Sequence, residues 1–256
     1  MKAHEVPDWR IYYAGRLASV RGANPVGAKP GDLVIHLANT KTPEEGAVAV
    51  PVVSPYRLAL NISIRAAKGA EAIRRSVVFS PKEKGAKDRV LDLKCMPILF
   101  DFFEQCMIAA TFSYQAIETY ANSRIVEELP QGSTFALQRG TSTKDVDATA
   151  LQRETSTSEK VATVLPHIAK IALSKSSSLW QDFVVLGQVR DATIHLKAKD
   201  HFVRGGKVDR ETLFYRLLNN KPRRYPATAL SLMRHFSKGS EITWLDHAEA
   251  LLKADT

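Results

Sequence analysis

An arginine, a carboxylate and a histidine lie within six residues of one another, at Arg190, Asp191 and His195. Arginine is a permanent cation that pairs with phosphate oxygens, and histidine gains and loses a proton near neutral pH. Together they are the groups needed to cut RNA without a metal ion. We therefore take this stretch as the candidate reactive site.

The spacing of the three residues fits one end of a helix. Asp191 lies four residues before His195, so both would share nearly one helical face, where the carboxylate could hold the imidazole in one tautomer. Arg190 and His195 are five residues apart, about 140° around an ideal helix. Only the long arginine stem could bring its guanidinium into the same pocket.

Three helices are predicted to position this site. The first runs from near Pro97 to about Ile125, with apolar residues every three or four positions. The second opens at residues 158–160 and is interrupted by Pro166, which should kink it. The third follows the serine run 176–178, which supplies an N-cap, and carries the candidate residues at its far end. The pattern predicts a mainly α protein built around a helical bundle.

The rest of the chain divides into shorter elements. Residues 1–56 are rich in Pro and Gly, with short β-like runs at 33–37 and 47–53. Residues 127–158 contain few large apolar side chains and read as a long flexible loop. Helices are predicted at 57–75, 209–220, 227–236 and 242–253.

The order of the three long helices resembles the HEPN superfamily. One matching stretch is 116–122, with Glu118 and Asn122 on the first long helix, and the other is the Arg-x4-His run from Arg190 to His195. The likeness covers about 96–238. It implies an N-terminal α+β segment of short strands at 1–90 and a HEPN-like bundle at 91–256, with the flexible insertion at 127–158.

The resemblance also implies a reaction. HEPN nucleases are metal-independent endoribonucleases that usually pair two domains across a symmetric cleft, so we expect a homodimer, an RNA substrate and no cofactor or metal. His195 would move protons at the 2′-hydroxyl and the leaving 5′-oxygen, Arg190 would stabilise the transition state, and Asp191 would orient His195 or position substrate. The product would carry a 2′,3′-cyclic phosphate.

Two further residues of the first long helix are candidates for a supporting role. Glu118 and Asn122 are one turn apart on one face. They could hydrogen-bond across the bundle to Arg190, either supporting the site or only satisfying a buried guanidinium. We expect the supporting role.

Basic residues are concentrated next to the candidate site. The chain has a formal net charge of +9, and residues 197–238 hold 11 Lys and Arg against 3 Asp and Glu. Such a block suits the phosphates of a nucleic acid, although a solvated basic surface explains charge alone equally well. The candidate RNA contacts are Lys197, Lys199, Arg204, Lys207, Arg223 and Arg224.

Several classes of protein find no support in the sequence. No apolar run approaches the roughly 20 residues of a membrane span, and the first residues lack the apolar core of a signal peptide. Cys95 and Cys106 form no CxxC pair, which favours reduced, structural thiols. HExxH, P-loop and GxSxG motifs are missing. We expect a cytoplasmic protein with no membrane partner.

Two alternatives to a nuclease stay open. The same residues could serve a non-catalytic RNA-binding or protein-interaction module, in which Arg190 and His195 act in folding or RNA contact. The chain could also be an interaction protein, for example one half of a toxin–antitoxin pair whose basic face meets an acidic protein partner. For the nuclease itself, the resemblance implies a setting in prokaryotic defence or a toxin–antitoxin system.

Overall fold

The computed structural model describes residues 8–12, 14–16, 29, 33–80, 91–139, 141–195, 210, 212–237 and 242–254. Most of these residues are helical, which confirms the predicted mainly α class. The helices are α1 (Pro55–Arg74), η1 (Leu93–Cys95), α2 (Met96–Glu128), α3 (Ala148–Glu154), α4 (Thr157–Glu159), the π-helical turn η2 (Lys160–Val164), α5 (Leu165–Ala169), α6 (Ser178–Ile194), α8 (Leu213–Asn219), α9 (Arg224–Phe236) and α10 (Ile242–Lys253).

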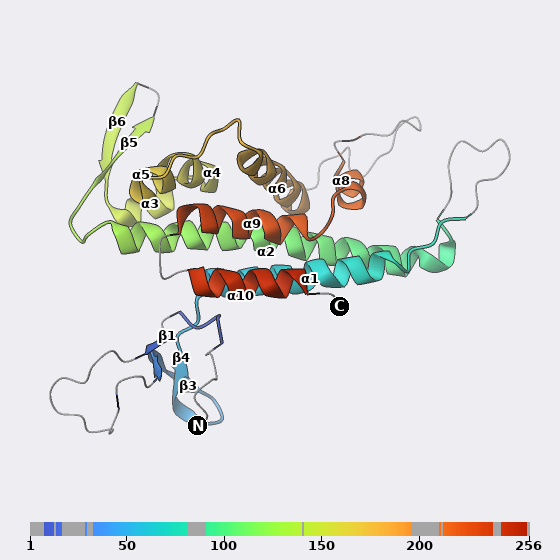
Figure 1. Cartoon of the computed structure of the whole chain (residues 1–256), viewed down its shortest axis with the longest axis horizontal. Helices are drawn as coiled ribbons and strands as arrows, with labels where there is room; N and C mark the ends of the chain where they lie inside the picture. Colours follow the sequence, from blue (N-terminus) through green and yellow to red (C-terminus); the bar gives the residue numbers. More distant parts are fainter. Residues whose placement is uncertain are drawn as a thin grey trace.

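The described strands form separate two-stranded antiparallel pairs, not one sheet. They are β1 (Ala14–Arg16) with β2 (Leu33–Ile35), β3 (Leu37–Thr42) with β4 (Gly46–Pro51), and β5 (Phe135–Arg139) with β6 (Ser142–Val146). Strands β2 and β4 confirm the predicted short strands at 33–37 and 47–53, and β4 pairs with β3 in a hairpin. This hairpin extends away from the helices, and most of its side chains are exposed (Figure 1).

Helix α2 runs through the middle of the molecule (Figure 1). In that view α1 and α10 lie below it, α9 lies along it, and α3 to α6 lie above. Helix α9 contacts α1, α2, α6 and α10, so it closes the bundle around the central helix. The candidate residues on α6 are therefore carried by a helix that packs on both α2 and α9.

Helices α1 and α2 pack closely because both present small side chains to each other. They are antiparallel: the rings of Tyr56 and Tyr120 meet edge to face at 5.5 Å near one end. Farther along, the Ser63 hydroxyl donates to the Ala109 carbonyl oxygen at 2.9 Å and lies 2.5 Å from the Ser113 hydroxyl. Further small residues that are buried on these two helices are Ala59, Ala66, Ala67, Ala70, Cys106, Ala110 and Ala116.

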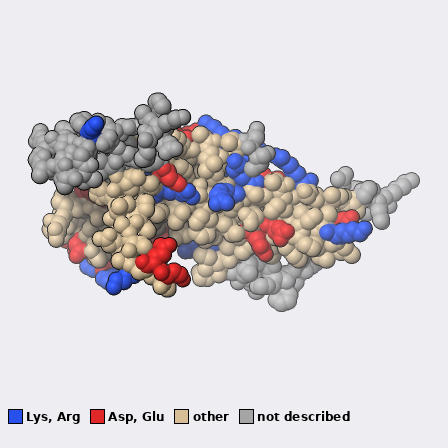
Figure 2. Space-filling model, turned by 90° about the horizontal axis from the view of Figure 1, so that it is seen from below, with Lys and Arg blue, Asp and Glu red and all other residues tan. Residues whose placement is uncertain are grey.

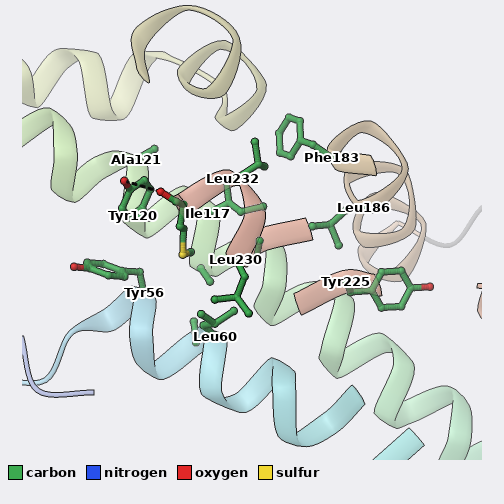
Figure 3. Packing of buried hydrophobic residues seen from close by; sticks show 14 of the residues in the cluster. Tyr56, Leu60, Ile117, Tyr120, Ala121, Phe183, Leu186, Tyr225, Leu230 and Leu232 are labelled. Atoms are coloured by element: carbon green, nitrogen blue, oxygen red, sulfur yellow. Dashed lines mark hydrogen bonds between the residues drawn. The ribbon is translucent and has the colours of Figure 1, made fainter. Parts of the chain in front are cut away.

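Larger apolar residues fill the space between α2, α6 and α9 (Figure 3). Phe183 and Leu186 of α6 are 1% exposed, and Leu232 of α9 is 2% exposed. The Tyr120 hydroxyl donates to the Met233 carbonyl oxygen at 3.3 Å. This hydrogen bond satisfies the buried phenol, because a buried hydroxyl without a partner would cost free energy. One apolar cluster therefore joins helices from both halves of the chain.

Serine side chains start the helices where the sequence predicts them. The Ser177 hydroxyl accepts from the Trp180 N–H at 3.2 Å and caps α6. Ser156 and Glu159 form a capping box at α4, two residues before the predicted start of the second helix. That helix then passes through the η2 turn and ends at Lys170, in the left-handed conformation with φ 56°. It is shorter and less regular than predicted.

The predicted flexible loop at 127–158 is wrong for its described residues. The segment holds the β5–β6 hairpin and helix α3, with Phe135, Leu137 and Val146 buried against the bundle. The hairpin forms because alternate residues of β5 face the core, which gives a short strand pair a surface to bury. The predicted domain boundary at residue 90 does not separate two cores, because α1, which precedes it, packs along α2, which follows it.

The long central helix is apolar enough to pass a simple test for a membrane span. Across Leu93–Glu128 an 18-residue window has a mean hydropathy of 1.3, with 33% of it buried. Length and composition alone decide that test, and the core helix of a bundle meets it equally well. Here α1, α6 and α9 all pack on this helix.

The dense packing around α1 predicts a strong effect of added volume. Ala67 of α1 is fully buried, whereas Ala72 on the same helix is exposed. We expect Ala67→Leu to lower the free energy of unfolding by about 1 to 3 kcal/mol, because the buried neighbours of Ala67 would have to move. Ala72→Leu should change it by less than about 0.5 kcal/mol. Urea denaturation of both variants checks this, and equal effects would contradict it.

Candidate functional site

Arg190 is fixed at the surface, near the end of α6, by one residue of α2 and one of its own helix. Its guanidinium lies 5.1 Å from the centre of the Tyr114 ring, within the range of a cation–π contact. Its Nη1 donates to Asp191 Oδ1 at 2.9 Å, and the side chain is 31% exposed. The guanidinium is thus held in place while part of it faces solvent.

His195 lies just beyond the last residue of α6 and is exposed. Its backbone has left the helical conformation, with φ −122° and ψ 70°, and its N–H donates to the Asp191 carbonyl oxygen at 2.8 Å. Among the described residues, its ring has no hydrogen-bond partner. The ring is therefore free to turn toward a ligand bound at this end of the helix.

The predicted role of Asp191 in orienting His195 is not observed. The Asp191 carboxylate pairs with Arg190, its neighbour in sequence, and is 64% exposed. The link between Asp191 and His195 is a backbone hydrogen bond. Because His195 ends the helix, its side chain no longer follows the i, i+4 geometry on which the prediction depended.

Glu118 and Asn122 do not reach Arg190, contrary to the prediction. The residue of α2 that meets Arg190 is Tyr114, one turn before Glu118 on the same face. Among the described residues, Asn122 Oδ1 is buried without a hydrogen-bond partner. The predicted supporting pair therefore lies on the correct face of α2, but too far along it.

The sequence does not indicate Tyr114, a residue of α2 that packs against α6. Its ring stacks on Phe183 at 5.9 Å between ring centres. A side chain at Gly187 would meet the same ring at 3.5 Å. Phe183, Gly187 and Arg190 recur at the spacing of one helical face, so all three lie over Tyr114. The available signal was an aromatic residue four positions before Glu118.

Glu118 instead lies near a buried lysine. Lys160, in the η2 turn, is 1% exposed, and its Nζ donates to the Gln152 carbonyl oxygen at 2.6 Å. Burial lowers the pKa of Lys160, and the negative charge of Glu118 partly opposes that shift. This buried cation is a further group that the sequence did not indicate.

The predicted RNA-binding residues divide into two groups. Lys197, Lys199, Arg204 and Lys207 lie outside the described residues. Arg223 pairs with Glu71 of α1, Nε to Oε2 at 2.6 Å, and its Nη1 donates to the Leu252 carbonyl oxygen at 2.9 Å. Arg224 pairs with Asp182 of α6 and is 48% exposed. These two arginines thus join helices, a role that the prediction of RNA contacts did not include.

The basic side chains do not form one continuous patch on the face that Figure 2 shows. Lys and Arg side chains lie there in separate groups, with acidic groups and wide neutral areas between them. In the described part of the chain, no three His, Cys, Asp or Glu side chains come together as a metal-binding group. The described charge pattern by itself therefore does not mark a nucleic-acid surface.

Comparison of this chain with protein-family models, with curated proteins and with solved structures found no match. Its function is therefore argued from the residues of the site.

The buried lysine predicts a pH dependence of stability. The pKa of Lys160 is lowered from 10.5, so the folded state releases this proton at a lower pH than the unfolded chain. In the window below 10.5 the unfolded state binds more protons, and the stability of the wild type should rise with pH relative to Lys160→Met. Denaturant unfolding at about pH 7 and about pH 10 measures this difference.

Lys175→Met is the matched control, because Lys175 is exposed. Its unfolding free energy should follow that of the wild type at both pH values. A constant difference between the wild type and Lys160→Met would contradict the lowered pKa.

Proposed function

We propose that this protein is a metal-independent endoribonuclease of HEPN type, with Arg190 and His195 as the reacting residues. One observation carries the proposal: a guanidinium held by Tyr114 and Asp191 lies at the same end of α6 as an exposed histidine ring. A fixed cation and an acid–base group at one site are what transphosphorylation of RNA needs.

The roles of the two side chains follow from their surroundings. A guanidinium has five N–H donors, and a single hydrogen bond from Arg190, to Asp191, occurs among the described residues. Its other donors can bind the phosphoryl oxygens as negative charge develops there. His195 can take the proton of the 2′-hydroxyl or return one to the leaving 5′-oxygen. The strand then ends in a 2′,3′-cyclic phosphate.

The site is proposed to be completed by a second copy of the chain. Arg190 is held against Tyr114 of α2, whereas His195 lies beyond the last residue of α6, and among the described residues no contact joins the two side chains. In a twofold dimer, the arginine of one copy and the histidine of the other can face a single phosphate. Prokaryotic defence or a toxin–antitoxin pair is the setting that the resemblance to HEPN proteins supports.

A non-catalytic RNA-binding module is the second candidate function, and one observation favours it. The Asp191 carboxylate is paired with Arg190 instead of His195, so in the described structure no side chain orients the histidine. Catalytic bases are normally oriented by a further group. In such a module Arg190 would contact phosphate and His195 would have no chemical role.

RNA cleavage by the purified protein in EDTA tests the first candidate. We expect labelled single-stranded RNA to be cut with cyclic-phosphate ends and the matching DNA to stay intact. His195→Ala should lower the rate by about 10² to 10⁴-fold, since a proton-transfer group is lost, but keep RNA binding in a gel shift. His247→Ala, at an exposed histidine of α10, is the matched control.

Intact RNA that is nevertheless shifted in the same gels, with the shift lost in Arg190→Ala, would favour the binding module. RNA that is neither cut nor shifted would contradict both candidates.

Tyr114 gives a second test of the site. Tyr114→Phe keeps a ring beneath Arg190 and should leave cleavage within about twofold, whereas Tyr114→Leu removes the cation–π contact and should lower it several-fold. Circular dichroism must show the same helical content for both variants. Equal activity of the two would exclude a role for the ring in positioning Arg190.

A further inference from the structure

A hollow of about 680 Å³ opens between the second half of α1, the turn from α8 to α9 and the last turn of α10. Its size is within the range of small-molecule sites. Four cationic side chains line it, Lys221, Arg223, Arg224 and Lys253, together with the amides of Asn219 and Asn220. Leu252, which is buried, and Ala227 give it a partly apolar floor.

Among the residues that line this hollow, cations outnumber carboxylates, and Arg224 and Lys253 are paired with acidic residues outside the lining. Glu71 is the acidic residue that lines it, and this carboxylate is already paired with Arg223. Arg223 is also bonded to the Leu252 carbonyl oxygen, so it forms a fixed wall between α1 and α10. The remaining lysines and Arg224 are left to act on a ligand.

These remaining cations can turn toward the hollow at small cost. Lys221 is exposed and has no side-chain partner among the described residues. Lys253 is 73% exposed and pairs with Glu249 one turn back at 2.6 Å. Exposed pairs of this kind contribute little to stability and exchange readily for a better partner. Arg224, also about half exposed, keeps further donors beyond its bond to Asp182.

The first turn of α9 contributes positive electrostatic potential to the hollow but few free N–H donors. Its Arg224 and Tyr225 N–H groups already donate to the carbonyl oxygens of Lys221 and Pro222, at 2.9 and 3.2 Å. The helix dipole still makes this end of α9 partly positive. An anion here would therefore be held by side chains.

We propose that this hollow binds a phosphate monoester, either of a small molecule or at the 5′ end of an RNA strand. A monoester carries close to two negative charges at neutral pH, which suits several cations, and the apolar floor can take the group attached to it. The inference is independent of RNA cleavage, because the hollow is separate from the Arg190 site. Asp182, the partner of Arg224, lies two turns before Arg190, roughly 12 Å along α6.

Calorimetric titration of the full chain with adenosine 5′-monophosphate tests the site, with adenosine and inorganic phosphate as further probes. We expect the monophosphate to bind, adenosine not to bind, and added salt to weaken binding. The double variant Lys221→Ala/Lys253→Ala should weaken it by roughly tenfold or more, because it removes two charged contacts to the ligand. The ion pair that is lost, Lys253–Glu249, lies within α10 and joins no two helices. Lys175→Ala, at an exposed lysine outside the hollow, should bind as the wild type does.

The RNA source is tested with 5′-phosphorylated and 5′-hydroxyl oligoribonucleotides in the His195→Ala background, where the strand stays intact. Binding of the phosphorylated strand alone, with no binding of the free monophosphate, would assign the site to RNA ends. The proposal is overturned if adenosine binds with the same affinity as its monophosphate. It is also overturned if no phosphorylated probe binds, or if the double variant binds them as the wild type does.

Discussion

The close contact between α1 and α2 is the constraint on which the remaining structure depends. Alanine and serine on both helices let the backbones approach, and the Ser63–Ser113 contact fixes their relative position along the axis. With one face of α2 taken up in this way, α6 and α9 must pack on its other faces. The position of the candidate site therefore depends on residues far from it that carry no chemistry.

Tyr114 transmits that arrangement to the site. Because its ring packs under Phe183, Gly187 and Arg190, it fixes both the position of α6 and the direction of the guanidinium. His195 lies one turn beyond this contact, where the helix has ended. The two candidate residues thus differ in how they are held: Arg190 is packed against α2 and His195 is not.

The described arginines also explain why net charge is a poor guide to function here. Arg223 joins α9 to α1 and α10, Arg224 joins α9 to α6, and Arg234 joins α9 to α10 through Asp246 and Glu249. Charges engaged in such pairs attract a polyanion less than the formal count suggests. A cation with no ion-pair partner among the described residues, such as Lys221 in the hollow beside α9, is more informative than the total.

The sequence by itself determined the features that depend on neighbouring residues. Apolar spacing and serine caps placed α1, α2, α6 and α10 close to their observed bounds, and Arg190, Asp191 and His195 at one helix end. Contacts between distant residues could be decided only by the tertiary structure. A helical face specifies a direction but not the level at which another helix crosses it, so Tyr114, and not Glu118, meets Arg190. Likewise, burial of Lys160 and of the β5–β6 hairpin depends on elements packed over them, which no local pattern encodes.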